Sequence, residues 1–281
     1  MRDVGVQCKL RTSPWTLQRK DEAIKRGPHK SALEFSDFLT EEMTSMVARG
    51  QWMVLPYNLV RDEPTLRIAP AGVVPQHDRR PRTIVDYSHS NLNQETVRLA
   101  PSESMQFGRT LPRLLQRIVH ADPRHGPVRM SKEDVADGFY RLHLRPGDIL
   151  ALGVAFPPAP DGTPLVAFPL TCPMGWVESP PWFTTATETG ADLANIALAS
   201  GYEPPPHRLD AAASTPPPPP EPTLPLLAEA PFQGLSAAVP SLPAPDPAGL
   251  PPGPRRKPLQ YVDISVDDYL GLPPGLSLIH M

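Results

Sequence analysis

The spacing of apolar residues along the chain predicts three helices. In the ranges 36–49, 111–119 and 180–199, apolar residues recur three and four positions apart, as they do on one face of a helix. Ser36 can cap the first helix and Gly50 can end it. The residues expected to supply apolar contacts are Leu39, Met43, Met46 and Val47, then Leu111, Leu114, Leu115, Ile118 and Val119, and finally Phe183, Leu193 and Ile196.

Short apolar runs between these ranges predict strands. The expected strands are 52–55, 66–69, 82–87, 128–135, 150–156 and 165–170. The second and third should form a hairpin with a long, basic tip from Pro70 to Pro81. The last two should form another hairpin, because Asp161 and Gly162 between them are typical turn residues.

Proline content divides the chain. Of the 281 residues 41 are prolines, and they concentrate in residues 203–258, which include an unbroken run from Pro216 to Pro220. Such a segment suits neither helices nor strands, so we expect it to be disordered or partly polyproline II, inserted into one folded domain. Residues 1–35 lack clear periodicity, and we expect them to be a poorly ordered, basic lead-in.

An acidic pair follows the last predicted strand. Val262, Ile264 and Val266 alternate with polar residues, as in a half-buried strand, and Asp267 and Asp268 come next. A second short apolar run then completes a hairpin. Adjacent carboxylates repel each other, which favours either a raised pKa or a bound cation such as Mg²⁺. Taken alone, an acidic pair in a hairpin is more often a solvated turn, so the rest of the chain has to decide between the two interpretations.

The overall charge and the cysteines exclude several classes of protein. The net charge of −3 excludes a globally basic nucleic-acid-binding protein. Two arginine clusters could still contact phosphates or simply form solvated faces, namely Arg79, Arg80 and Arg82, and Arg109, Arg113 and Arg117. Two cysteines are too few for a disulfide framework, and we see neither a secretory signal nor a membrane span. We therefore expect an intracellular protein, cytoplasmic or nuclear, without a membrane partner.

Three motifs stand in a fixed order. Residues 134–140 begin with Asp134 and carry a glycine and an aromatic residue four and five positions later. Residues 173–183 have the pattern Pro-x-Gly-x-x-x-Ser-Pro-x-x-Phe, and residues 266–270 contain the acidic pair. Together they resemble the reverse transcriptase family, most nearly the enzymes of retrotransposons. Residues 82–87 resemble the fingers strand that precedes the palm in this family.

The resemblance implies an α+β fold of polymerase-like fingers and palm. The small antiparallel palm sheet would be backed by helices and interrupted by the Pro-rich insertion. The implied divisions are a lead-in at 1–35, a fingers-like region at 36–120, palm at 121–202, the insertion at 203–258 and the palm hairpin with the acidic pair at 259–281.

The resemblance also implies a two-metal site for nucleotidyl transfer. Asp134, Asp267 and Asp268 would hold Mg²⁺ or Mn²⁺ as catalytic ligands. The implied nucleotide-binding residues are Arg82, Phe139, Met174 and Gly175. Phe139 could instead be an ordinary core aromatic, and Arg82 a surface charge. We expect structural roles for Asp86 and Asp137.

Two departures from the family pattern shape the expected activity. Ser265 occupies the position of the usual aromatic residue before the acidic pair, and Met281 follows soon after, without a thumb. We therefore expect weak or absent polymerisation on an RNA or DNA template-primer with dNTPs. The alternative is a non-catalytic interaction protein that displays the Pro-rich segment to Pro-motif-binding domains. An RNA-directed RNA polymerase fits residues 173–183 poorly.

Overall fold

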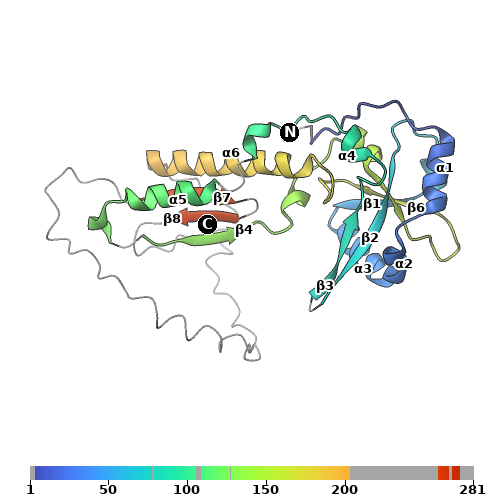
Figure 1. Cartoon of the computed structure of the whole chain (residues 1–281), viewed down its shortest axis with the longest axis horizontal. Helices are drawn as coiled ribbons and strands as arrows, with labels where there is room; N and C mark the ends of the chain where they lie inside the picture. The colour runs from blue at the N-terminus through green and yellow to red at the C-terminus, as the bar shows by residue number, and fades with distance from the viewer. Residues whose placement is uncertain are drawn as a thin grey trace. The chain divides into compact units, whose positions relative to one another are not determined.

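The computed structural model describes residues 4–77, 79–105, 109–126, 128–202, 259–265 and 268–272 (Figure 1). The chain forms two compact units. Unit 1 comprises Met1–Phe107 and Asp134–Thr189, and unit 2 comprises Gly108–Glu133 and Gly190–Met281. The predicted α+β class is confirmed, with one mixed sheet and one small antiparallel sheet. The predicted Pro-rich insertion, 203–258, lies outside the described residues.

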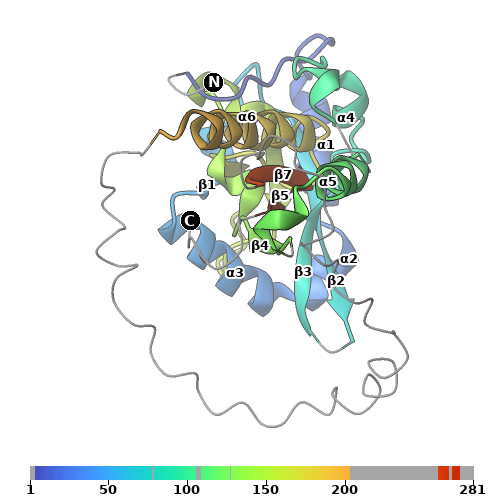
Figure 2. The same ribbon diagram turned by 90° about the vertical axis from the view of Figure 1, so that its left-hand side faces the viewer.

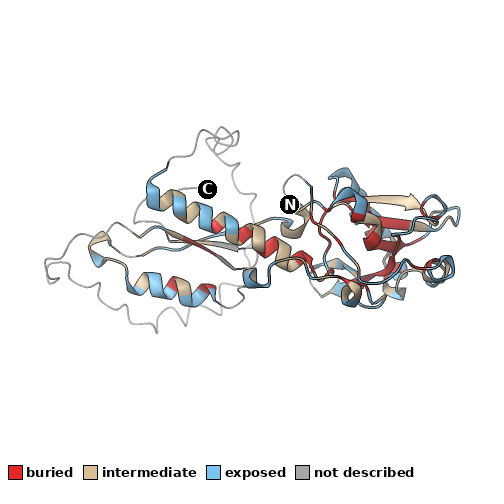
Figure 3. Cartoon of the chain, turned by 90° about the horizontal axis from the view of Figure 1, so that it is seen from above, coloured by how far each residue is buried: buried red, intermediate tan, exposed pale blue. Residues whose placement is uncertain are grey.

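Unit 1 is built on a five-stranded sheet. Its strands, in spatial order, are β1 (Trp52–Pro56), β6 (Leu165–Pro169), β5 (Gly153–Phe156), β2 (Ile68–Gln76) and β3 (Arg79–Val85). β2 and β5 are parallel, and the other pairs are antiparallel. The central strand β5 is buried throughout (Figure 3). The predicted hairpin of β5 and β6 is confirmed, although a 3-10 helix (Pro146–Leu152) replaces the start of the expected strand.

The predicted helix at 36–49 is α3 (Ser36–Ala48). Leu39, Met43 and Met46 are buried as expected, whereas Val47 is 42% exposed. The helix begins without a side-chain cap, because Phe35 rather than Ser36 is the N-cap residue. Gly50 ends it with a φ of 68°, the left-handed conformation that glycine adopts at low cost.

The expectation of a poorly ordered lead-in is wrong for the described part of residues 1–35. This region contains α1 (Leu17–Arg26) and α2 (Lys30–Glu34), and Trp15 just before α1 is buried. Lys20 on α1 is buried as well, and its Nζ donates hydrogen bonds to the carbonyls of Arg61 (3.0 Å) and Glu63 (2.6 Å). A buried lysine contradicts the usual helical pattern, which explains why apolar periodicity did not reveal α1.

The expected long tip between Pro70 and Pro81 is also wrong. β2 and β3 stay paired out to Gln76 and Arg79, so the hairpin has a short turn and long arms. Pro75 falls at an irregularity of the register, and Pro81 lies on β3 at the edge of the sheet. Proline is tolerated at both kinds of position, because neither requires its missing N–H. The basic residues of this region therefore stand on an edge strand.

Unit 2 contains the small sheet except for Asp134, which is assigned to unit 1. The strands of this sheet, in spatial order, are β4 (Ser131–Asp134), β8 (Asp268–Leu272) and β7 (Tyr261–Ser265). β7 and β8 form the predicted hairpin, with Ser265 opposite Asp268. The predicted helices at 111–119 and 180–199 are α5 (Thr110–Val119) and α6 (Ser179–Ser200). α5 runs beside β7 (Figure 2).

The contact between α6 and β7 differs from the expected one. Val262 is buried against Ala191, Ala194 and Leu198, whereas Leu193 and Ile196, which we expected to supply contacts, are more than 60% exposed. Asn195 also binds the edge of β7. Its Nδ2 donates to the carbonyl of Val262 (2.7 Å), and its Oδ1 accepts from the N–H of Val262 (2.9 Å). Two alanines, Leu198 and one amide therefore make the contacts that we expected from Leu193 and Ile196.

Our first prediction concerns the acid stability of unit 1. Asp21 accepts hydrogen bonds from Arg61 Nε (2.8 Å) and from the Tyr57 hydroxyl (2.7 Å), and these bonds lower its pKa to about 2. Because the unfolded-state pKa is about 3.9, the pair stabilises the fold above about pH 4 and this contribution is lost as the pH falls towards 2. Asp21→Asn should therefore be less stable than the parent chain at pH 6, and the difference should vanish near pH 2.

The measurement is urea unfolding followed by tryptophan fluorescence. All 4 tryptophans lie in unit 1, so the signal reports that unit. Glu22→Gln, on the same helix at an exposed position, is the control and should leave stability unchanged. A stability difference for Asp21→Asn that is equal at pH 6 and pH 3 would contradict the role assigned to the carboxylate.

Candidate functional site

The structure distributes the predicted site residues over the two units. Arg82, Phe139, Met174 and Gly175, the nucleotide-binding candidates, all lie in unit 1. Among the metal-ligand candidates, Asp134 is the last residue of β4 and belongs to unit 1, whereas Asp268 is the first residue of β8 and belongs to unit 2. Asp267 lies outside the described residues. We describe the two groups separately.

The turn at Met174 and Gly175 packs directly onto the backbone of β3. Gly175 has a φ of 91°, and a Cβ built on it would lie only 2.5 Å from the carbonyl oxygen of Val85. No other residue type fits this position without moving one of the two segments. The missing Cβ of Gly175 therefore permits a close approach to the backbone of β3. Met174, beside it, is 49% exposed.

Asn93 holds this turn from the other side. Its Nδ2 donates to the carbonyl of Gly175 (2.9 Å), and its Oδ1 accepts from the N–H of Val177 (3.0 Å). Trp176 between them is buried, and its Nε1 donates to Thr96 Oγ1 (3.2 Å). The sequence analysis missed Asn93, because nothing local marks an asparagine whose partners lie 82 and 84 residues later.

The polar residues of the second motif also stabilise its conformation. Glu178 is buried, and its Oε2 accepts from the N–H groups of Leu99 (2.7 Å) and Ala100 (2.9 Å). Ser179, the first residue of α6, is buried, and its hydroxyl donates to the carbonyl of Pro173 (2.7 Å). The segment from Pro173 to Ser179 is thus fixed at both ends. These hydrogen bonds support the turn.

The first motif packs against the second through its aromatic residue. Asp137 has a φ of 57° and precedes a 3-10 helix (Gly138–Arg141). This turn places the Phe139 ring edge-on against Phe183 of α6, with centroids 5.3 Å apart. A Cβ on Gly138 would lie 2.8 Å from Phe183, so the glycine permits this packing. Phe139 is half-buried and therefore belongs in part to the core, which was the alternative interpretation of this residue.

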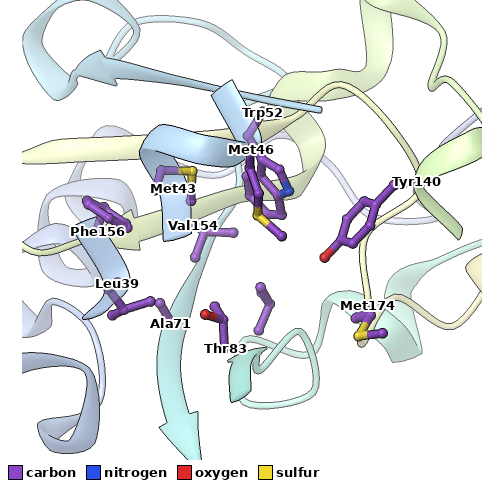
Figure 4. Close-up of a pocket in the computed structure, with 11 residues that line it drawn as sticks. Leu39, Met43, Met46, Trp52, Ala71, Thr83, Tyr140, Val154, Phe156 and Met174 are labelled. Atoms are coloured by element: carbon purple, nitrogen blue, oxygen red, sulfur yellow. The ribbon is translucent and has the colours of Figure 1, made fainter. Parts of the chain in front are cut away.

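A small hollow lies where these segments meet β3 (Figure 4). Its volume is about 20 Å³, enough for one water molecule. Thr83, Tyr140 and Met174 line it together with apolar residues of α3 and the sheet. The Thr83 hydroxyl is buried there and has no hydrogen-bond partner in the described part of the chain. Burial raises the pKa of Tyr140 to about 12, so its phenol stays protonated at neutral pH.

The hollow is far too small to hold a nucleotide, since ligand pockets usually exceed about 300 Å³. The hollow is informative because the residues that line it come from the segments that carry the candidates. Thr83 follows Arg82 on β3, and Tyr140 follows Phe139, while Met174 precedes Gly175. Unit 1 therefore brings the segments of all four nucleotide-binding candidates together. Arg82 itself is exposed on β3, so it can meet a solvent-exposed ligand.

The acidic candidates belong to neighbouring strands of the small sheet. β4, which ends at Asp134, neighbours β8, which begins at Asp268. The two strands approach closely, because a Cβ on Gly271 of β8 would lie 2.6 Å from Ser131 Oγ of β4. The side chain of Asp134 is exposed. Among the described residues, no hydrogen bond or ion pair has to be broken before this carboxylate can bind a hydrated cation.

Asp263 on β7 plays a structural role instead. It is buried and forms a bidentate ion pair with Arg113 of α5, whose Nε (2.8 Å) and Nη2 donate to the carboxylate. The Tyr261 hydroxyl donates to the same carboxylate (3.0 Å), and Arg117 lies 4.6 Å from the centre of the Tyr261 ring. Two arginines of the cluster that could have contacted phosphates thus hold α5 against β7.

Our second prediction concerns the turn at Gly175. Gly175→Ala should destabilise unit 1, because the new Cβ collides with Val85 and the backbone conformation becomes strained. Gly162→Ala is the matched control, since Gly162 also has a positive φ, 84°, but nothing lies within 4 Å of its Cβ position. The control should cost about 1–2 kcal/mol from backbone strain alone. Gly175→Ala should cost a further 1–3 kcal/mol, roughly the price of overpacking.

Urea unfolding followed by tryptophan fluorescence measures both variants. Equal losses in the two variants would mean that the approach of Gly175 to β3 is loose, which would contradict the geometry described above.

No family model matches this sequence, and no curated protein matches it either. The relation to reverse transcriptases therefore remains a resemblance of motifs. The function has to be argued from the residues and from the arrangement described here.

Proposed function

We propose that the chain derives from a retroelement reverse transcriptase and that its acidic residues serve template-directed nucleotide addition. One observation carries the proposal. The strand that ends at Asp134 and the strand that begins at Asp268 are neighbours in a small antiparallel sheet, although 134 residues separate them in the chain. Two-metal nucleotidyl transfer needs carboxylates from separate strands, and this sheet topology supports such an arrangement.

The donor set suits a hard divalent cation. Carboxylate oxygens are the ligands that Mg²⁺ and Mn²⁺ prefer, and the exposed Asp134 can reach a hydrated ion. We propose Asp134, Asp267 and Asp268 as the ligands. When bound, the ions would stabilise the charge on the attacking and leaving oxygens during the displacement. The 3′-hydroxyl oxygen of the primer would form a bond to the α-phosphorus of the nucleotide, and pyrophosphate would leave.

Unit 1 would supply the nucleotide contacts. Arg82 is exposed on β3 and could pair with the triphosphate, as arginine often does. Met174 is half exposed beside Gly175, in a turn that Asn93 and the β3 backbone hold in place. Phe139 would lie under the sugar, supported by Phe183. Positioning of this kind supplies much of the rate enhancement in transfer reactions of this class.

Our third prediction tests the proposal by single-nucleotide addition. The full chain is incubated with an RNA template, a labelled DNA primer and the next complementary dNTP, with Mg²⁺ or with Mn²⁺. We expect slow, metal-dependent extension by one nucleotide. Asp134→Asn and Asp268→Asn should each lower the rate by roughly a hundredfold or more, because each removes one charge from the transition-state environment.

Asp137→Asn is the matched control. Asp137 is three positions from Asp134 and contacts Arg49 (3.7 Å) and Gln51 (3.5 Å), so its replacement should leave the rate within about twofold. Extension that persists unchanged in Asp134→Asn and Asp268→Asn would contradict the site assignment. Absence of extension in the parent chain with either metal would contradict the proposed activity.

A further inference from the structure

A second group of metal-ligating side chains lies in unit 1, apart from the acidic candidates. His29, Asp86 and His89 each offer a ligand atom, and these atoms lie within 4.8 Å of one another. The Nε2 of His29 is 3.2 Å from Asp86 Oδ2, and the rings of His29 and His89 meet edge to face with centroids 5.6 Å apart. His29 and Asp86 are partly buried, whereas His89 is exposed.

Backbone hydrogen bonds to one strand hold two of the three residues in place. The N–H of His29 donates to the carbonyl of Ala71 (2.8 Å), and the N–H of Asp86 donates to the carbonyl of Pro70, the residue before Ala71 (3.0 Å). Both acceptors belong to β2. The side chains of His29 and Asp86, 57 residues apart in the chain, are thus presented from adjacent points on a rigid element.

Local contacts orient the side chains further. Asp86 Oδ1 accepts from the N–H of His89 (2.8 Å), which leaves Oδ2 directed at His29. The His29 ring also lies near Gly72 of β2, since a Cβ built on this glycine would be 3.4 Å from His29 Cδ2, an ordinary contact distance. Outer contacts of this kind fix the orientation of metal ligands in known sites.

We propose that His29, Asp86 and His89 bind a divalent transition metal ion of the zinc class and leave one coordination position open. Imidazole and carboxylate are the usual ligands of zinc at bond lengths of about 2.0–2.2 Å. A tetrahedral site with such bonds places its ligand atoms about 3.3 Å apart. The separation of 3.2 Å between His29 and Asp86 already matches this value.

To complete the site, the side chain of His89 has to move closer to the other two ligands. Its ring is exposed, so rotation about its side-chain bonds can bring a nitrogen to the metal without disturbing the core. Without metal, His29 and Asp86 form a hydrogen bond, and Asp86 also interacts with the nearby charge of Arg26. The ion has to replace this hydrogen bond and compete with the arginine, which favours an affinity in the micromolar range over a tighter one.

A metal at this position would join the start of α2 to the end of β3. It would therefore stiffen the base of the β2–β3 hairpin on which Arg82 stands. This role is independent of the acidic residues, since Mg²⁺ prefers oxygen ligands and has little affinity for two imidazoles.

Our fourth prediction is tested by titrating the full chain, without an added histidine tag, with Co²⁺ and then with Zn²⁺. Co²⁺ serves as a spectroscopic probe because tetrahedral coordination gives strong visible absorption. We expect absorption that saturates at one equivalent with a Kd below about 100 µM, and that Zn²⁺ abolishes but Mg²⁺ does not. Zinc should also raise the thermal midpoint, because it binds only the folded chain.

Three variants and one control decide the assignment. His29→Gln, Asp86→Asn and His89→Gln should each weaken metal binding by more than about tenfold. His89 is exposed, so His89→Gln should keep the metal-free thermal midpoint and remains informative even if the other two fold poorly. His143→Gln, at another exposed histidine, should bind as the parent does. A parent Kd above about 100 µM, or unchanged binding in His89→Gln, would overturn the proposal.

Discussion

Unit 1 depends on the direct approach of one backbone to another at Gly175. Because this residue lacks a Cβ, its turn rests on the carbonyl of Val85, and β3 and the start of α6 become neighbours. Asn93 and Glu178 then fix the turn with hydrogen bonds to segments about 80 residues away. The consequence is that Arg82 and Met174 belong to one rigid framework, although neither is itself buried. A larger residue at position 175 would separate the two segments.

Unit 2 relies more on polar contacts than on a large apolar core. The buried pair of Arg113 and Asp263 joins α5 to β7, and Asn195 extends the hydrogen bonding of β7 onto α6. A buried carboxylate left without its arginine would be strongly unfavourable, so this pair specifies how the helix lies on the strand. The part of the chain that carries Asp268 therefore owes its conformation to interactions that are absent from the apolar pattern.

Periodicity predicted where several main elements lie, although not all of the contacts that hold them. The helices α3, α5 and α6 and the hairpin of β7 and β8 appear near their expected positions. It failed where a polar residue is buried, as with Lys20 in α1, whose amine is satisfied by two carbonyls. It also failed for prolines, because only the sheet order reveals that Pro81 stands on an edge strand.

The candidate site was predictable only in part. Motif spacing marks Asp134, Asp268 and Gly175 as candidates, because each motif is local in sequence. It could not identify the residues that hold them, since Asn93 meets Gly175 only after folding. The same limit applies to His29 and Asp86, which were not linked by any local pattern and lie 3.2 Å apart in the structure. Among the described residues, no helix is long and apolar enough to cross a membrane.

The central claim is that the carboxylates of β4 and β8 form one metal site. The most direct measurement is anomalous diffraction at the manganese edge from crystals of the full chain soaked in MnCl₂. The account predicts a peak within coordination distance of carboxylate oxygens from both Asp134 and Asp268. Crystals that show manganese at neither residue, or at one of them without the other, would contradict the account.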